Sequence, residues 1–265
     1  MNLNLQGKLA LVTGSTRGIG LASARGLADM GAEVIVHGRS RAATDGAIKS
    51  IRQALPDAKL RAVQADLATA AGCADLIAQE PQVDILVNNV GVYDPKPFFD
   101  ITDDDWQAMM DINIMSGVRL TRHYLKAMLQ ADGWGRVVFI SSESGIVVPK
   151  EMVHYGFSKS AQLVIARGAA ESTRGTNITV NSVLPGPTWV EAQQPRLEAR
   201  AKEQNTTVDS LKEKTFTERR PTSLLQRYAT PEEVASLVCY VCSPASSATN
   251  GAALRVDGGV VANPF

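Results

Sequence analysis

The sequence predicts an α/β protein with a doubly wound, Rossmann-type sheet of seven parallel strands and helices on both faces. Short apolar runs alternate with segments of helical spacing along the chain, and the runs are too uniformly apolar for strands that face water on one side. No linker, repeat or low-complexity stretch interrupts the alternation, so we expect residues 1–265 to form one domain.

The first half of the chain alternates strands and helices without a break. Its strands are short runs rich in Leu, Val and Ile, and its first two helices stop where Gly31 and Pro56 follow, since both residue types end helices. In chain order we expect a strand at 8–13, a helix at 19–30, a strand at 33–37, a helix at 41–55, a strand at 60–65, a helix at 69–79 and a strand at 83–88.

The second half continues the alternation with longer helices. The first of these carries three consecutive acids, Asp103 to Asp105, in its first turn, where the helix dipole stabilises negative charge. In chain order we expect a helix at 102–130, a strand at 135–141, a helix at 153–173, a strand at 178–184, a helix at 231–241 and a strand at 254–257.

Residues 187–227 break this rhythm. Acids and bases nearly cancel between Glu191 and Arg220, and the helical periodicity is weak. The segment follows a strand, at the edge of the sheet where open α/β folds bind their ligands. We therefore expect short helices with few buried contacts, forming a substrate lid at about 187–227 that is more mobile than the sheet.

Composition excludes several classes of function. The 27 basic and 27 acidic residues cancel, whereas a nucleic-acid binder needs a basic surplus. No apolar run approaches the roughly 18 residues that span a bilayer, so we expect no membrane association. The three cysteines do not form a disulfide framework and indicate a cytoplasmic protein. Cys239 and Cys242 have metal-site spacing but no second pair, so we expect buried thiols and no metal.

A glycine-rich turn follows the first strand and precedes the first helix, with the sequence Thr-Gly-Ser-Thr-Arg-Gly-Ile-Gly at 13–20. Glycines let the backbone approach a pyrophosphate, and the helix N-terminus supplies N–H groups and a positive dipole end. The spacing differs from G-x-G-x-x-G, but the strand-turn-helix context favours a dinucleotide over a purely structural turn.

The end of the second strand indicates which dinucleotide binds. NAD-binding proteins place an acid near this position to accept from the ribose 2′-hydroxyl. This chain has Gly38 followed by Arg39, and Arg17 in the glycine-rich turn could reach the same ribose. Guanidinium groups suit a 2′-phosphate, so we expect NADP(H) to be preferred over NAD(H); the alternative is that both arginines are merely solvated.

Tyr155 and Lys159 are four residues apart on one expected helix and so share a face. A free tyrosine has a pKa of about 10, and a nearby ammonium lowers it by stabilising the phenolate. Ser142 follows the fifth strand and could offer a hydroxyl to the same substrate oxygen. A Tyr-x-x-x-Lys pair alone is common by chance, so it indicates a catalytic site only in combination with the other motifs of the chain.

The motifs occur in one order along the chain. The glycine-rich turn is followed by Asn-Asn-Val-Gly at 88–91, Asn113, Ser142, the Tyr155 to Lys159 pair, Pro-Gly at 185–186 and Val-Asp-Gly-Gly at 256–259. This joint pattern resembles the short-chain dehydrogenase/reductase family, single-domain type, over residues 5–260. One departure is Val90, where the family usually has alanine.

The resemblance implies a catalytic tetrad of Asn113, Ser142, Tyr155 and Lys159. Tyr155 would be the general acid in carbonyl reduction and the base in alcohol oxidation. Lys159 would hold the nicotinamide ribose and lower the pKa of Tyr155, and Ser142 would hydrogen-bond the carbonyl oxygen. Asn113 would order a water that feeds protons to Lys159.

The resemblance also implies the residues that contact the cofactor. They fall at the glycine-rich turn, after the second, third and fourth strands, on the catalytic helix and after the sixth strand. They are Gly14, Ser15, Thr16, Arg17, Gly18, Ile19, Gly20, Gly38, Arg39, Asp66, Leu67, Asn89, Gly91, Tyr155, Lys159, Pro185, Gly186 and Thr188.

The expected reaction is reversible hydride transfer between NADP(H) and a small-molecule ketone or secondary alcohol. A 3-oxoacyl thioester is the nearest substrate guess, although Gln130 to Asp132 stand where carrier-protein reductases often have a basic run. An NAD-dependent sugar or cyclic alcohol dehydrogenase remains open, as does a non-catalytic dinucleotide-binding regulator. The family implies a homodimer or homotetramer built through the helices at 102–130 and 153–173. Whether His154, Glu143 or Ser144 touches the substrate stays undecided.

Overall fold

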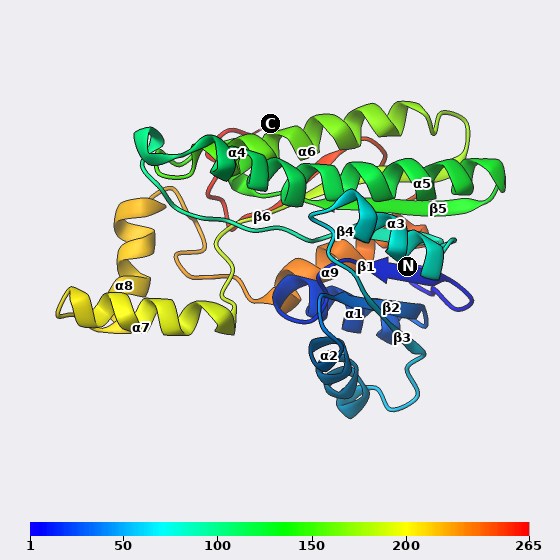
Figure 1. Ribbon diagram of the computed structural model, residues 1–265, viewed down its shortest axis with the longest axis horizontal. Coiled ribbons are helices and arrows are strands. Elements are labelled where there is room, and N and C mark those ends of the chain that lie inside the picture. The colour runs from blue at the N-terminus through cyan, green and yellow to red at the C-terminus, as the bar shows by residue number, and fades with distance from the viewer. Residues whose placement is uncertain (265) are drawn as a thin grey trace.

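The computed structural model describes residues 1–264 and contains a single α/β domain (Figure 1). All seven strands are parallel and run in the order β3-β2-β1-β4-β5-β6-β7, which confirms the expected fold class. The strands are β1(Leu9–Val12), β2(Glu33–Gly38), β3(Leu60–Gln64), β4(Ile85–Asn88), β5(Trp134–Ile140), β6(Asn177–Pro185) and β7(Ala253–Val256).

The helices lie where the sequence predicts them, with ends shifted by one or two residues. The main helices are α1(Gly18–Asp29), α2(Arg41–Ala54), α3(Ala70–Gln79), α4(Asp103–Met109), α5(Ser116–Gln130), α6(Val153–Glu171), α7(Gln194–Glu203), α8(Val208–Lys214) and α9(Pro231–Cys242). The part of the chain that the structure describes has no helix long and apolar enough to cross a membrane.

The sheet is covered on both faces, and consecutive apolar residues of its central strands pack on opposite sides. In β1, Ala10 and Val12 pack with α1, α2 and α9, whereas Leu11 between them packs with α3, α5 and α6. Alternate side chains of a strand point to opposite faces, so an uninterrupted apolar run supplies two cores at once. Cys239 and Cys242 lie in the first core and Cys73 in the second, as free, buried thiols.

The strand order reverses between β1 and β4. From β1 the chain builds outward to β2 and β3, and from β4 it builds the other way to β7. The crevice beyond the carboxyl ends of the two central strands is therefore the switch point at which open α/β sheets bind ligands. The glycine-rich turn follows β1 and the Asn-Asn-Val-Gly motif follows β4, so both motifs lie at this edge.

The long helix expected at 102–130 contains a π-helical turn, η2(Met110–Met115), which joins α4 to α5. Such a turn interrupts the regular i→i−4 hydrogen bonds and often marks a functional site. Asn113 lies inside η2 and is buried. Asn113 therefore lies in an irregular turn rather than in a regular helix.

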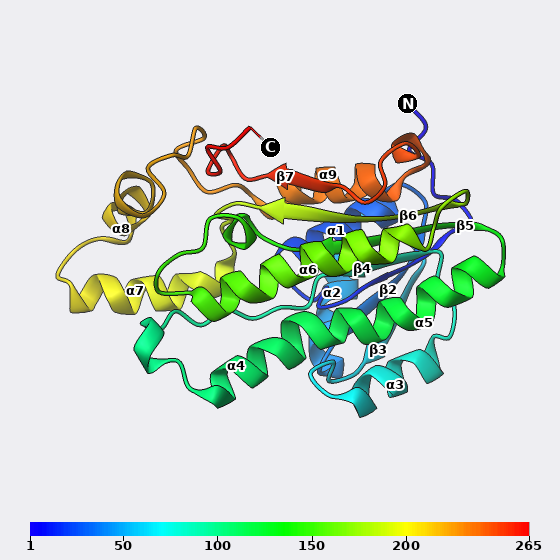
Figure 2. The ribbon, with the colours of Figure 1, turned by 90° about the horizontal axis from the view of Figure 1, so that it is seen from above.

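The segment at 187–227 forms α7, α8 and a second π-helical turn, η5(Thr215–Arg219). Figure 2 shows the arrowheads of β6 and β7 pointing toward α7 and α8. Few residues of this segment are buried, as expected; among its described side chains they are Ala201, Leu211, Phe216 and Ser223. The rings of Trp189 and Phe216 pack against Tyr228, just beyond the segment, at 5.5 and 5.0 Å.

Candidate active site

The glycine-rich turn adopts a backbone that its residue types make possible. Gly14 has a φ of 63°, which L-residues rarely adopt, and a Cβ there would lie 3.1 Å from Cγ2 of Val90. A Cβ on Gly20 would collide with the side-chain amide of Asn89 and with the Gly14 carbonyl. Val90, the departure from the family pattern, is thus accommodated by close packing against Gly14.

Hydrogen bonds between the ends of β1 and β4 hold the turn in place. The hydroxyl of Thr13 accepts from the backbone N–H groups of Asn89 at 2.9 Å and Val90 at 3.0 Å. The side-chain amide of Asn89 donates to the carbonyls of Thr13 and Gly14 at 2.8 and 3.1 Å. Asn89 therefore braces the turn, and Thr13 is a supporting residue that the sequence argument did not single out.

His37 is a second supporting residue that the sequence argument missed. Its Nδ1 accepts from the Gly14 N–H at 2.9 Å, and its Nε2 lies 3.1 Å from the carbonyl of Ala65. These partners assign the hydrogen to Nε2, since the amide can only donate and the carbonyl can only accept. Burial lowers the pKa of His37 to about 4, so the ring stays neutral and keeps this arrangement at neutral pH.

The N-terminus of α1 fits the pyrophosphate of a dinucleotide. The residue before the helix, Arg17, makes no side-chain hydrogen bond to the first turn, whereas Ser40 caps α2 and Thr69 caps α3. The first N–H groups of a helix have no intrahelical acceptor and carry the positive end of its dipole. Together with the closely braced glycines, this terminus can hold an anionic group against the backbone.

Arg17 and Arg39 lie at the edge of the sheet where the adenosine end of a dinucleotide would fall. Both are exposed, and among residues 1–264 neither side chain forms an ion pair or hydrogen bond. Arg41 begins α2 and pairs with Asp45 at 3.5 Å. This third guanidinium, two residues beyond Arg39, was not part of the sequence prediction.

The resemblance also assigns Asp66 and Leu67 to the adenosine end of the cofactor site, and their side chains differ in exposure. Asp66 is exposed, and its Oδ1 accepts from the backbone N–H of Ala68 at 3.2 Å. Leu67 is only 2% exposed and packs in the core beneath β1 and β2. The side chain of Leu67 is therefore committed to the core, which leaves its backbone for any contact with a cofactor.

Tyr155 and Lys159 lie on α6, as their spacing predicts, with Nζ 5.7 Å from the centre of the phenol ring. Burial raises the pKa of Tyr155, a hydrogen bond with Ser142 opposes this shift, and the charge of Glu143 adds to it. Burial also lowers the pKa of Lys159 to about 8. The environment thus favours a neutral phenol, the form that can donate a proton.

Ser142 is buried, and its hydroxyl both accepts and donates a hydrogen bond within the protein. Its hydroxyl accepts from the N–H of Ser144 at 3.1 Å and donates to Oε2 of Glu143 at 2.5 Å. The other oxygen of Glu143 accepts from Nε of Arg220 at 3.1 Å. Arg220 follows η5, so this partly buried ion pair joins the segment at 187–227 to Glu143 and, through it, to Ser142.

Asn113 does not direct its side chain at Lys159. Its Nδ2 donates to the Val92 carbonyl and to Oγ of Ser158, both at 2.9 Å, and its Oδ1 accepts from the Val92 N–H at 2.8 Å. These contacts fix the loop after β4 against α6. The backbone carbonyl of Asn113 accepts from the side-chain amide of Gln162 at 2.6 Å.

Strand β6 ends at Pro185, and Gly186 follows it directly. A Cβ on Gly186 would collide with the backbone of Asp257, so glycine is needed for this close approach. Thr188 donates to the Gly186 carbonyl at 3.0 Å and bridges to Ala229 in parallel fashion. The two ends of the segment at 187–227 are therefore joined at its base.

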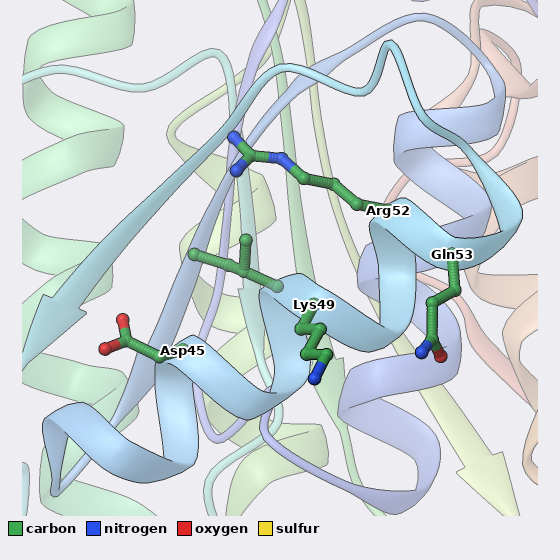
Figure 3. Close-up of a pocket in the computed structure, with 5 residues that line it drawn as sticks. Asp45, Lys49, Arg52 and Gln53 are labelled. Carbon is green, nitrogen blue, oxygen red and sulfur yellow. The ribbon is translucent and has the colours of Figure 1, made fainter.

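The remaining candidates lie elsewhere. His154 is fully buried with its ring 6.0 Å from Trp106 on α4, so it packs between helices rather than lining the site. A surface depression shown in Figure 3 runs along α2 and contains none of the candidate site residues. Its lining residues are Asp45, Ile48, Lys49, Arg52 and Gln53.

Comparison with known proteins places this geometry among oxidoreductases. The family described as Enoyl-(Acyl carrier protein) reductase matches residues 14–261. The chain is 48% identical to the uncharacterized oxidoreductase YvaG of Bacillus subtilis over 265 residues, which cover 100% of both proteins. It is 31% identical to a 3-oxoacyl-(acyl-carrier-protein) reductase of Aquifex aeolicus, over 98% of this chain and 100% of that protein. The solved structure of L-sorbose reductase from Gluconobacter frateurii, complexed with NADPH and L-sorbose, has a TM-score of 0.92 at 26% identity and covers 99% of this chain and 100% of that one.

Proposed function

The chain belongs to the short-chain dehydrogenase/reductase family, and we propose that it reduces a small-molecule ketone to a secondary alcohol with NADP(H), by a reversible reaction centred on Tyr155. The observation that carries the proposal is the convergence of Ser142, Tyr155 and Lys159 at the carboxyl edge of the sheet. A purely regulatory dinucleotide-binding protein has no need of these three groups together.

Each residue has a defined task in this proposal. The glycine-rich turn with the N-terminus of α1 would hold the pyrophosphate of a dinucleotide, which would supply the hydride when bound. Tyr155 donates its phenolic proton to the carbonyl oxygen, and the Ser142 hydroxyl turns from Glu143 to donate to the same oxygen when the substrate binds. Lys159 would hold the nicotinamide ribose of the cofactor, and its charge stabilises the phenolate that is left on Tyr155.

The preference for NADP(H) rests on charge at the end of β2. Gly38 offers no acid to the ribose, while Arg17 and Arg39 are free of protein partners among residues 1–264. Similarity to L-sorbose reductase, which was solved with NADPH, points in the same direction. Charge-assisted hydrogen bonds from two guanidiniums to a phosphate would favour NADP(H) by a factor of about ten to a thousand.

Two substrate classes follow from different similarities. Sequence similarity to the Aquifex reductase favours a 3-oxoacyl thioester, whereas structural similarity to L-sorbose reductase favours a sugar or another polar ketone. A cyclic ketone is a third possibility left by the sequence. The buried, charged pair of Glu143 and Arg220 next to Ser142 favours a polar substrate over a purely aliphatic one.

One experiment tests both cofactor and substrate class. The purified protein is assayed for NADPH and NADH consumption against a panel of an acetoacetyl thioester, a ketose and a cyclic ketone. We expect turnover of at least one ketone with NADPH and slower turnover with NADH. Tight binding of NADPH with no turnover across a broad panel would instead favour the dinucleotide-binding regulator.

We also propose that residues 187–227 form a lid over the substrate. The segment lies beyond β6 and contacts the catalytic serine through Arg220 and Glu143, while Arg219 pairs with Glu151. Its charged, exposed helices depend on few contacts with the sheet, so we expect faster amide hydrogen exchange in α7 and α8 than in the strands, slowed by NADPH and substrate. Exchange as slow as in the strands without ligand would contradict a mobile lid.

The face formed by α5 and α6 is the proposed site of homodimer or homotetramer formation. A groove there is lined by Val118, Leu125, Leu129 and Ile165, among others, and Val164 nearby is 73% exposed. Apolar side chains gathered on one exposed face are typical of interaction sites. Sedimentation of the wild type and of a Val164→Glu variant tests whether this face forms the oligomer.

A further inference from the structure

Gln162 lies between two groups of the proposed catalytic site, although no sequence motif marks it. It follows Lys159 by three residues on α6, and it is 2% exposed. Its Nε2 donates to the backbone carbonyl of Asn113 at 2.6 Å, and its Oε1 accepts from Nζ of Lys159 at 3.3 Å. One side-chain amide therefore connects the π-helical turn η2 directly to the catalytic lysine.

The orientation of this amide is set by its partners. A carbonyl can only accept and an ammonium can only donate, so the nitrogen of Gln162 must face Asn113 and its oxygen must face Lys159. The carbonyl of Asn113 lies in η2, where the regular helix hydrogen bonds are interrupted, and it accepts from Gln162. Reversing the amide would leave two buried groups unpaired, which is costly.

Hydrogen bonds inside the protein occupy two of the three N–H donors of the Lys159 ammonium group. One N–H goes to the carbonyl of Ile140 at 2.9 Å and a second to Gln162, which leaves one for a ligand or for Tyr155. Burial alone disfavours the charged ammonium. A fixed acceptor at Nζ opposes that effect and restricts the directions in which the third N–H can point.

We propose that Gln162 is a positioning residue for Lys159 and occupies the bridging place that the family resemblance gives to a water on Asn113. This inference rests on the proposed function. An amide does not pass a proton along, so Gln162 holds the ammonium charged and oriented rather than relaying protons to it. In this chain Asn113 therefore acts on Lys159 through the side chain of Gln162.

Two substitutions separate positioning from simple packing. Gln162→Met keeps the length and most of the volume but removes the acceptor and the donor. Gln162→Ala opens space for a water, which needs about 30 Å³ and two to four polar partners, and both Asn113 and Lys159 remain to bind it. If Gln162 only fills space, Ala is the more damaging change, because it leaves a cavity.

The first readout is the pH profile of alcohol oxidation, measured on a substrate that the wild type turns over. Losing the acceptor disfavours charged Lys159, which raises the pKa of Tyr155 and moves the rising limb to higher pH. We expect a shift of roughly half to one pH unit in Gln162→Met and less in Gln162→Ala. A shift in neither variant, or an equal shift in both, would overturn the proposal.

The second readout does not depend on turnover, so it separates this inference from the proposed function. NADPH affinity is titrated by the fluorescence of the bound nucleotide in the wild type and both variants. We expect Gln162→Met to bind several-fold more weakly and Gln162→Ala to bind within twofold of the wild type. Weaker binding by Ala than by Met would identify Gln162 as a packing residue. Gln162→Leu replaces the Met variant if that protein does not fold.

Discussion

The two ends of the candidate cofactor site differ in how firmly the protein holds its own side chains. At the nicotinamide end, Asn113, Lys159 and Gln162 are 1%, 4% and 2% exposed, and each makes hydrogen bonds inside the protein. At the adenosine end, Arg17 and Arg39 are exposed, and within residues 1–264 they have no ion pair. The groups proposed to react are held by hydrogen bonds within the protein, whereas the groups proposed to select the cofactor have no ion pair among residues 1–264.

The difference follows from what each end has to do. Proton transfer depends on geometry within a few tenths of an ångström, so its groups belong on rigid elements with supporting hydrogen bonds. Choosing between a phosphate and a hydroxyl depends on net charge, which flexible guanidiniums supply without a fixed arrangement. We therefore expect substitutions at the buried end to change rates and stability, and substitutions at the exposed end to change cofactor choice.

The largest effect is expected from Tyr155→Phe, which removes the proton donor and keeps the ring. Turnover should fall by about a hundredfold to ten-thousandfold, the usual range for general acid–base catalysis, while NADPH affinity stays within a few-fold of the wild type. Steady-state rates on a proven substrate and a nucleotide titration check the two parts. Near-wild-type turnover would remove Tyr155 from the mechanism. It would also contradict the view that the buried end of the site carries out the proton transfer.

The next effect is expected from the arginines at the exposed end. Wild type should bind NADP⁺ about tenfold to a thousandfold more tightly than NAD⁺, and Arg39→Leu or Arg17→Leu should each reduce this ratio without changing turnover at saturating cofactor. Equal affinity of the wild type for both nucleotides would show that these guanidiniums point into solvent.

The double substitution Gly38→Asp with Arg39→Leu should reverse the preference for NADP(H) over NAD(H). This test needs a steric control that the sequence did not suggest. A Cβ at Gly38 would lie 2.6 Å from Cγ2 of Thr16, so the acid also crowds the glycine-rich turn. Gly38→Ala introduces the same crowding without the charge. Weaker binding of both nucleotides by the Ala variant measures the steric part, and the remainder of the Asp effect is electrostatic.

A smaller effect, on stability, is expected where Arg220 meets Glu143. The Glu143 side chain is 6% exposed and that of Arg220 is 19% exposed, so removing the arginine leaves a buried carboxylate without its partner. Arg220→Ala should cost about 2–3 kcal/mol of unfolding free energy, and Glu143→Gln about 1 kcal/mol. Urea denaturation of both variants measures the asymmetry, and a larger cost for Glu143→Gln would contradict it.

The fold could be predicted because its determinants are local. An apolar run fixes a strand, a glycine or proline ends a helix, and alternation fixes a parallel sheet. The glycine-rich turn and the Tyr155–Lys159 pair are also local, so their places could be predicted too. Leu67 was different, because a residue beside a ligand site can turn its side chain into the core, and neighbouring sequence does not show which way it points.

The contacts that support the site could not be predicted because they join distant segments. Glu143 and Arg220 are 77 residues apart, and Gln162 and Asn113 are 49 apart. In the sequence, Gln162 cannot be distinguished from other polar residues of a helix. Its contact depends on the carbonyl of Asn113 in the π-helical turn η2, which only the fold brings close to it. His37 reads as part of an apolar strand, and only the folded turn shows that it holds Gly14.

The smallest expected effect is the response of cofactor choice to salt, and it tests the comparison most directly. Exposed charges are screened over about 10 Å at 0.1 M salt and about 3 Å at 1 M, whereas buried pairs are screened far less. Raising salt across this range should therefore reduce the NADP⁺ to NAD⁺ affinity ratio by roughly three- to tenfold, because only NADP⁺ carries the 2′-phosphate. Turnover at saturating cofactor should change less than about twofold, since Lys159 and Gln162 are paired inside the protein. NAD⁺ affinity serves as the internal control for general salt effects. An affinity ratio unaffected by salt would mean that the site of the 2′-phosphate is sheltered from solvent. The two ends of the candidate cofactor site would then differ less in their electrostatic screening than the exposure of their side chains suggests.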